Sequence, residues 1–214
     1  MSLIDALLEL IYPTRCAFCH KLTQGGAKVC PQCRKVLPYV TGPGQRFRAV
    51  DICVSALYYE KDVRQSLHRY KFGGLRAYAQ IYGEFLEKCV DENRISCDII
   101  TWVPLSRRRL RSRGYDQARL LAEELAGRMG TACAPLLKKR RDNPAQSGTG
   151  GPEKRRANVR GVYEAVSGEL IQGKRVLIVD DIVTTGSTLF ECAATLREAG
   201  AASVAAVTVA QTRK

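Results

Sequence analysis

The sequence predicts a parallel α/β sheet with helices on both faces, preceded by a small module held together by four cysteines. Three observations support this. Apolar runs of strand length alternate with amphipathic helical patterns through most of the chain. The apolar run at residues 176–179 leads into two carboxylates and a hydroxyl-rich turn, which is typical of a buried parallel strand that ends at a ligand-binding edge. Two Cys-x-x-Cys pairs lie near the start of the chain.

The first expected element is a short amphipathic helix over residues 1–11, whose leucines and isoleucines recur at helical spacing. We expect it to pack on its own domain, and the pattern leaves open a peripheral association with a membrane surface. The chain has no run of about 18 apolar residues, which argues against a membrane-spanning helix. The apolar start lacks the basic region of a signal peptide, so the nine cysteines favour the reducing cytoplasm.

The cysteine module consists of Cys16-x-x-Cys19 and Cys30-x-x-Cys33, with ten residues between the two pairs. Four thiolates at this spacing can surround one Zn²⁺ tetrahedrally. Redox chemistry is the alternative, but paired motifs favour zinc. We predict a structural zinc in a segment too small to form its own core. The other cysteines are predicted to be small core residues: Cys53, Cys89, Cys97, Cys133 and Cys192.

A Gly- and Pro-containing segment at residues 38–45 predicts a linker. We therefore divide the chain into a helix and zinc ribbon at residues 1–45 and a second domain at residues 46–214. The second domain is expected to contain, in order, a strand at 50–59, helices at 63–72 and 75–90, a strand at 98–103, a helix at 117–129, a strand at 132–137, a long polar loop at 138–156, a short strand from Tyr163, a strand at 175–179, a helix at 189–199 and a strand at 203–209.

The turn after the strand at 175–179 is the most informative stretch. Its polar and small residues are Asp180, Asp181, Thr184, Thr185, Gly186, Ser187 and Thr188. N–H groups at a helix N-terminus suit a phosphate, glycine allows close backbone approach, and the hydroxyls add donors. Two carboxylates would repel that phosphate, so we assign them to vicinal ribose hydroxyls. The stretch predicts a 5-phosphoribosyl site, and the alternative is a generic strand–loop–helix.

The charge balance points to a polyanionic ligand. The chain has 34 Lys+Arg and 21 Asp+Glu, a net charge of +13, and residues 105–160 hold 15 Lys+Arg and 5 Asp+Glu, a net charge of +10. Such a run is often only a solvated surface, but this one begins directly after a predicted strand, where open α/β sheets bind ligands. Arginine forks match phosphate oxygens. We predict that Arg107, Arg109 and Arg113 contact a pyrophosphate or a DNA backbone.

Residues 179–188 resemble the 5-phosphoribosyl-1-pyrophosphate (PRPP) signature of type I phosphoribosyltransferases. The order of blocks along the whole chain resembles the ComF family, in which a four-cysteine zinc ribbon precedes a phosphoribosyltransferase-like domain. The resembling blocks are residues 16–33, 70–73, 103–117, 144–148, 155–163 and 179–188. The resemblance implies a type I phosphoribosyltransferase-like sheet. It adds Lys71, Gly114, Gln117 and Arg155 to the residues expected at a pyrophosphate or a DNA backbone.

One departure from the family pattern concerns the basic block. Asp116 stands where that family usually has Asn. An acid beside the arginines would weaken anion binding unless its side chain points away.

Two functions follow from the resemblance, and the sequence leaves the choice between them open. In the first, the protein is an active transferase that binds Mg²⁺ with PRPP. Arg109, Arg113 and Lys71 then clamp the pyrophosphate, and Arg155 lies on a loop at 138–156 that closes over it. No segment dictates an acceptor, so whether the protein is an enzyme stays undecided.

In the second function, the protein acts in DNA uptake during natural competence, and the same pocket and basic loops bind single-stranded DNA without sequence preference. Tyr70, Phe72, Tyr115 and Tyr163 are candidates for stacking on bases. The zinc ribbon would then bind DNA or a helicase-like partner. A PRPP-sensing regulator is a third hypothesis, and the type I fold is compatible with a homodimer.

Overall fold

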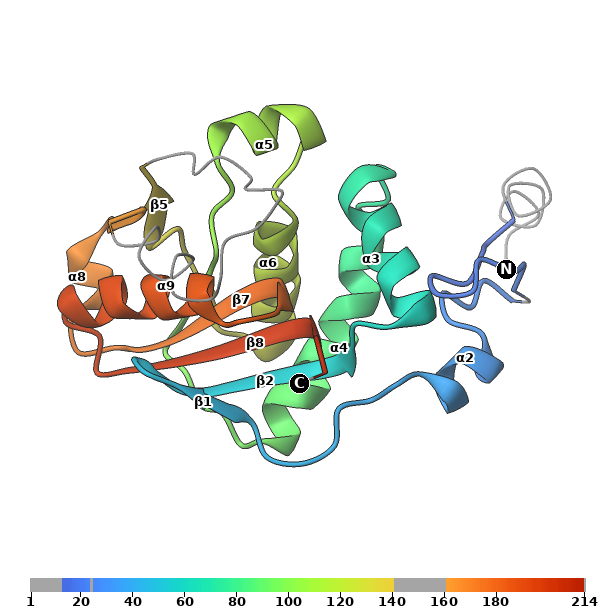
Figure 1. Ribbon diagram of the computed structural model, residues 1–214, viewed down its shortest axis with the longest axis horizontal. Coiled ribbons are helices and arrows are strands. Elements are labelled where there is room, and N and C mark those ends of the chain that lie inside the picture. Colours follow the sequence, from blue (N-terminus) through green and yellow to red (C-terminus); the bar gives the residue numbers. More distant parts are fainter. Residues whose placement is uncertain (1–12, 24, 141–160, 214) are drawn as a thin grey trace.

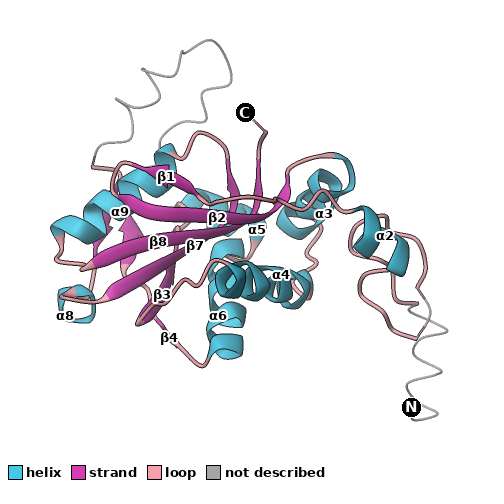
Figure 2. Ribbon diagram, turned by 90° about the horizontal axis from the view of Figure 1, so that it is seen from below, coloured by secondary structure: helices cyan, strands magenta, loops and turns pink. Residues whose placement is uncertain are grey.

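A computed structural model describes residues 13–23, 25–140 and 161–213. Its centre is a six-stranded sheet in the order β1-β2-β8-β7-β3-β4 (Figure 1 and Figure 2). The strands are β1 (Gln45–Phe47), β2 (Val50–Tyr58), β3 (Ile99–Trp102), β4 (Ala132–Cys133), β7 (Arg175–Val183) and β8 (Ser203–Gln211). Every neighbouring pair is parallel except β1 with β2. The prediction of a parallel α/β sheet is confirmed.

Helices cover both faces of the sheet (Figure 2). On one face, α3 (Lys61–Phe72), α4 (Tyr78–Glu92) and α6 (Gln117–Met129) bury their apolar residues in one core. On the other face, α9 (Ser187–Glu198) and the short α8 (Gly168–Ile171) help to form a second core. Among the described helices, none has the length and apolar character that crossing a bilayer requires.

Strand β7 is longer than predicted, so Asp180 and Asp181 lie within the strand and not after it. Its pairing with β8 continues from Asp180↔Thr208 to Val183↔Gln211. A strand is held by its backbone ladder, which carboxylate side chains do not interrupt when the partner strand continues. The expected strand at 175–179 is therefore corrected to Arg175–Val183.

Two further predictions of local structure were wrong. The basic run after β3 is not a loop but a helix, α5 (Arg107–Arg113), which the Ser106 hydroxyl caps by accepting from Arg109 N and which ends at Gly114 with φ 74°. The single strand expected at 132–137 is split. Pro135 has no N–H to donate to a ladder, and β5 (Leu137–Lys139) instead pairs antiparallel with β6 (Tyr163–Ala165) in a separate two-stranded sheet.

The linker at residues 38–45 runs along the outer edge of β2. Val40 N donates to Ala56 O at 3.0 Å, and Tyr58 N donates to Pro38 O at 2.7 Å. The zinc-ribbon segment, which includes α2 (Pro31–Val36), packs beside α3 and α4 at one end of the molecule (Figure 1). Its buried residues share one apolar core with those helices. The helix expected at residues 1–11 lies outside the described residues, and the domain division at residue 45 stays a prediction.

Candidate functional site

The carboxyl ends of β3 and β7 mark the place where a ligand is expected. These two strands are neighbours, although the chain first continues from β3 outward to β4 and only later returns to β7. Such a reversal of strand order leaves a crevice at the carboxyl edge of an open α/β sheet. The turn at residues 184–186 follows β7 and α5 follows β3, so both begin at this edge.

The two adjacent carboxylates have different surroundings. Asp181 is only 9% exposed, and its Oδ1 lies 2.7 Å from Lys71 Nζ. Asp180 accepts a hydrogen bond from Asp181 N at 2.8 Å. Burial raises the pKa of Asp180 to about 8, and the charge of Asp181 adds to this effect. Burial and, to a smaller extent, the charge of Asp180 raise the pKa values of the Cys53 and Cys192 thiols. Both cysteines belong to the core beneath α9.

Side chains alternate across a strand, so these two carboxylates belong to opposite faces of the sheet. Asp181 lies on the side of α3, where it pairs with Lys71. Asp180 lies on the side of α9. The sequence suggests one shared role for the two acids. Among the described residues, however, it is Asp181 and not Asp180 that directly contacts a cation of the basic blocks.

The turn after β7 has the features that a phosphate requires. Thr184, Thr185 and Thr188 are exposed, and the Thr185 and Ser187 hydroxyls lie 2.9 Å apart. Helix α9 begins at Ser187, so the N–H groups of its first turn lie at this edge. Gly186 has φ 74°, and a Cβ there would lie 2.6 Å from the Phe47 ring. Only glycine fits both that backbone conformation and the contact with β1.

The predicted cations divide into two groups. Lys71 and Arg113 are half-buried beside Asp181, where burial lowers the pKa of Arg113 and the charge of Asp181 opposes that shift. Arg113 donates to Gln117 Oε1 at 2.7 Å. Arg107 and Arg109 are exposed on α5, and Gly114 ends that helix. Arg155 lies outside the described residues, as does most of the loop expected at 138–156.

Asp116 has a structural role that our reading of the basic block missed. Its carboxylate caps α6 by accepting from Arg119 N at 3.2 Å, and it also accepts from Leu105 N at 3.1 Å. Burial raises the pKa of Asp116, while the hydrogen bonds from these backbone N–H groups lower it. The side chain therefore faces backbone donors. An Asp directly before a helical pattern is a recognised capping signal, so the sequence contained the clue.

Of the four aromatic residues considered for base stacking, three are core residues. Tyr70, Tyr115 and Tyr163 are at most 7% exposed, whereas Phe72 is 60% exposed. The Arg113 guanidinium lies 4.9 Å from the centre of the Phe72 ring. Only Phe72 is therefore on the surface, next to a predicted anion-binding residue.

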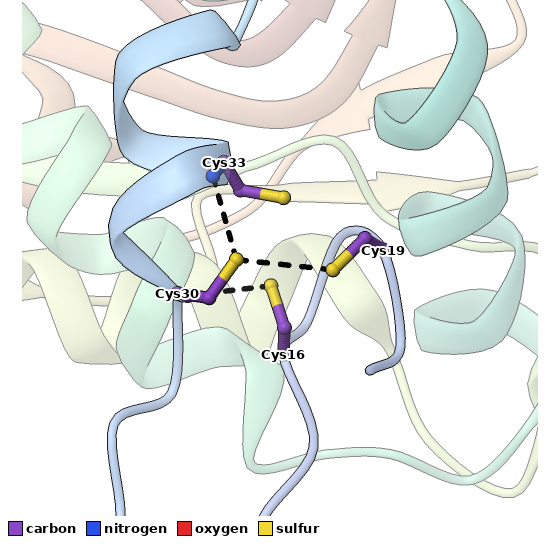
Figure 3. Close-up of side chains that lie close together, drawn as sticks. All are labelled: Cys16, Cys19, Cys30 and Cys33. Carbon is purple, nitrogen blue, oxygen red and sulfur yellow. Dashed lines mark hydrogen bonds between the residues drawn. The ribbon is translucent and has the colours of Figure 1, made fainter. Parts of the chain in front are cut away.

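The four ribbon cysteines form a metal-sized cluster. Their sulfur atoms all lie within 4.8 Å of one another, and Cys19 Sγ and Cys30 Sγ are 3.8 Å apart (Figure 3). Zinc–sulfur bonds of about 2.3 Å in a tetrahedron place the sulfur atoms about 3.8 Å apart. The backbone N–H groups of Cys30 and Cys33 donate to Cys16 Sγ and Cys30 Sγ, which suits thiolates. The donor set fits one zinc ion.

Comparison with known proteins gives the relationship of the chain. The profile of the double zinc ribbon domain matches residues 7–44, and that of the phosphoribosyl transferase domain matches residues 113–214. The DNA utilization protein YhgH of Salmonella typhimurium is 30% identical over 199 residues, which cover 88% of this chain and 86% of that protein. The chain belongs to the ComF family.

Another ComF relative is the competence protein ComFC of Streptococcus pneumoniae, 29% identical over 203 residues, with 94% of this chain and 82% of that protein covered. Among solved structures, a glutamine PRPP amidotransferase from B. subtilis aligns with a TM-score of 0.44 at 26% identity, over 62% of this chain and 26% of that one. Together, the ribbon profile and the cluster of four thiols support the predicted structural zinc.

Proposed function

We propose that the carboxyl edge of β7 and β3 binds the phosphoribosyl diphosphate group of PRPP, or a related ligand, with Mg²⁺. The observation that carries this proposal is the ion pair of Lys71 and Asp181 next to the turn after β7, with Arg113 close enough for the charge of Asp181 to oppose the lowering of its pKa by burial. They come from α3, β7 and the end of α5, three segments far apart in the sequence. One surface therefore combines an acid suited to hydroxyl groups with cations suited to phosphate.

The ion pair of Lys71 and Asp181 explains how a carboxylate can lie in an anion-binding site. At 2.7 Å, the ammonium group neutralises Asp181 when no ligand is bound. An incoming diphosphate offers Lys71 a second anion, and the Asp181 oxygens then become acceptors for ribose hydroxyls. The exposed hydroxyls of Thr185 and Thr188 and the N-terminus of α9 bind the 5′-phosphate. Mg²⁺ would neutralise part of the charge of the diphosphate.

Titration with Mg²⁺ and PRPP tests this proposal directly. Trp102 is the last residue of β3, so its fluorescence should report binding at the edge, and calorimetry gives the affinity independently. We expect saturable binding, and a loss of at least about 100-fold in Asp180→Asn/Asp181→Asn, because charged acceptors contribute about 1.5–3 kcal/mol each. Asp91→Asn, at an exposed position in α4, should bind like the wild type. Equal affinity of the double variant and the wild type would refute the assignment.

We place this site in the handling of DNA, because the relatives are named for DNA utilization and competence. Binding of PRPP is not by itself catalysis, and we propose no acceptor. A specific feature favours single-stranded DNA as a second ligand. Helix α5 contains five arginines and no acid, and four of them, at positions 107, 108, 109 and 111, are exposed. Such a surface suits a sugar–phosphate backbone.

Replacing Arg107, Arg109 and Arg111 together by alanine should weaken binding of single-stranded DNA to a similar extent for every sequence. The slope of log affinity against log salt should fall by about 2, since each lost phosphate contact contributes about 0.7 for single strands. Fluorescence anisotropy with oligonucleotides at several salt concentrations measures both quantities. Lys174→Ala, at the opposite edge of the sheet before β7, is the control. An unchanged affinity and slope in the triple variant would rule out α5 as the DNA contact.

A further inference from the structure

A line of buried aromatic rings connects the first zinc knuckle to the candidate site. Phe18, between Cys16 and Cys19, packs edge-to-face on Tyr82 with ring centres 6.4 Å apart. Tyr82 packs on Tyr70 at 5.3 Å, and Tyr70 packs on Tyr115 at 6.1 Å. All four rings are at most 7% exposed. Edge-to-face pairs have specific geometry and the core is closely packed, so a shift of one ring changes the position of the next.

Hydrogen bonds hold Tyr82, Tyr70 and Tyr115 of this aromatic line in place. Tyr82 and Ser66 of α3 share a hydrogen bond of 2.6 Å. The Tyr70 hydroxyl donates to Gln117 O at 2.9 Å, and Tyr115 donates to Tyr70 O. Gln117 is the residue whose side chain accepts from Arg113 at 2.7 Å. Tyr70 of the aromatic line therefore bonds the residue whose side chain binds Arg113.

Arg69 makes a second connection between the knuckle and the site. Its NH2 group donates to Ala17 O at 2.9 Å and to Phe18 O at 2.7 Å, the two carbonyls between the first pair of cysteines. Arg69 lies two residues before Lys71, in the last turn of α3. Its Nε is the only buried side-chain nitrogen or oxygen among the described residues that has no hydrogen-bond partner. An unpaired buried donor costs stability, so the contact is not optimised for stability alone.

We propose that the zinc ribbon is a positioning element of the candidate site, with Arg69 as its positioning residue. The knuckle carbonyls hold Arg69, which sets the last turn of α3 and places Lys71 against Asp181. The aromatic line sets Gln117, which places Arg113. The ribbon folds on its metal, so these carbonyls are fixed only when the four thiolates hold zinc. This inference rests on the proposed function for the identity of the ligand, but not for the coupling itself.

Coupling between two sites is reciprocal, so both directions can be measured. We expect Arg69→Met to weaken binding of Mg²⁺ with PRPP by about tenfold, within the usual range of couplings, while the variant keeps one zinc. Saturating PRPP should slow zinc transfer to a chromogenic chelator in the wild type and should not do so in Arg69→Met. Arg64→Met, an exposed arginine on the same helix, is the matched control and should match the wild type in both measurements.

Two further variants keep the test decisive if Arg69→Met fails to fold. Arg69→Lys retains one donor to the knuckle and should give an intermediate affinity. Tyr70→Phe removes only the hydroxyl that bonds Gln117 O, and it should weaken PRPP binding without changing zinc content. Suppose that the wild type binds PRPP, and that both variants bind PRPP with the same affinity and release zinc at the same rate as the wild type. The inference is then wrong, and the proposed function stands.

If the wild type does not bind PRPP, the proposed function fails and hydrogen exchange decides the coupling. Amides in the last turn of α3 and at residues 113–117 should then exchange faster in Arg69→Met than in Arg64→Met, while amides in the strands of the sheet should exchange at the same rate in both variants. Equal exchange in the two variants would overturn the inference.

Discussion

Cys33→Ser is expected to abolish zinc binding and to lower the melting temperature of the whole chain by about 10 °C or more. Cys33 is 4% exposed and belongs to the same apolar core as residues of α3 and α4. A structural zinc contributes about 10–16 kcal/mol to the folding of a small module, far more than a cysteine side chain contributes by packing. Since ribbon and helices share a core, loss of the metal should loosen both.

Metal analysis and differential scanning calorimetry of the purified variant measure these two effects. Cys133→Ser is the control, because this half-buried cysteine lies in β4, outside the cluster of four thiols. It should retain one zinc per chain and melt close to the wild type. Recovery of Cys33→Ser with one tightly bound zinc and an unchanged melting temperature would show that the four-thiol assignment is wrong.

Asp180→Asn is expected to stabilise the ligand-free protein at pH 8.5 by several kcal/mol, since each unit of pKa shift corresponds to about 1.4 kcal/mol. Burial raises the pKa of Asp180 from 3.8 to about 8 in the folded chain. Below about pH 4 the carboxyl is protonated in both states and contributes nothing to stability. Between about pH 4 and 8 the unfolded chain releases the proton while the folded chain retains it, so the wild type loses stability as pH rises. Asparagine removes that penalty.

Denaturant unfolding at pH 5 and pH 8.5 measures the effect, and the advantage of Asp180→Asn should be larger at the higher pH. Asp98→Asn should behave in the opposite way. Arg175 holds the pKa of Asp98 down at about 2, so its pairing stabilises the fold above the ordinary pKa and is lost only as pH falls. No gain for Asp180→Asn at pH 8.5 would show that this carboxyl is solvated. A real gain would mean that the acid is retained despite its cost, as expected of a functional residue.

The sheet and its long helices could be predicted because their signals are local. Helix α6 matches the range 117–129, and β8 and α9 differ from their predictions by only a few residues. The misses depend on information that periodicity does not contain. Helix α5 has a charged sequence with little apolar pattern, and its Ser106 cap and Gly114 end are visible only as single residues. The length of β7 is set by its partner β8.

The candidate site was predictable as a set of residues but not as a geometry. Lys71, Arg113 and Asp181 were all named from motifs in the sequence, yet only folding shows that a lysine of α3 pairs with an acid of β7. Asp180 and Asp181 belong to opposite faces because both lie inside β7. The strand predicted from the sequence ends at residue 179, which would place both acids after the strand. The contacts of Arg69 with the knuckle carbonyls are between backbone and side chain, and no motif marks them.

The path of residues 38–45 is expected to affect how molecules of this protein associate with one another. The segment covers the outer edge of β2 through the hydrogen bonds of Val40 and Tyr58, and the ribbon covers Tyr82 and Phe85 on α4. A fragment that begins at residue 46 would present an unpaired strand edge next to exposed aromatic rings. Open edges of this kind recruit strands from other molecules. We therefore expect the N-terminal segment to limit edge-to-edge association, and a fragment without it to aggregate more readily than the full chain.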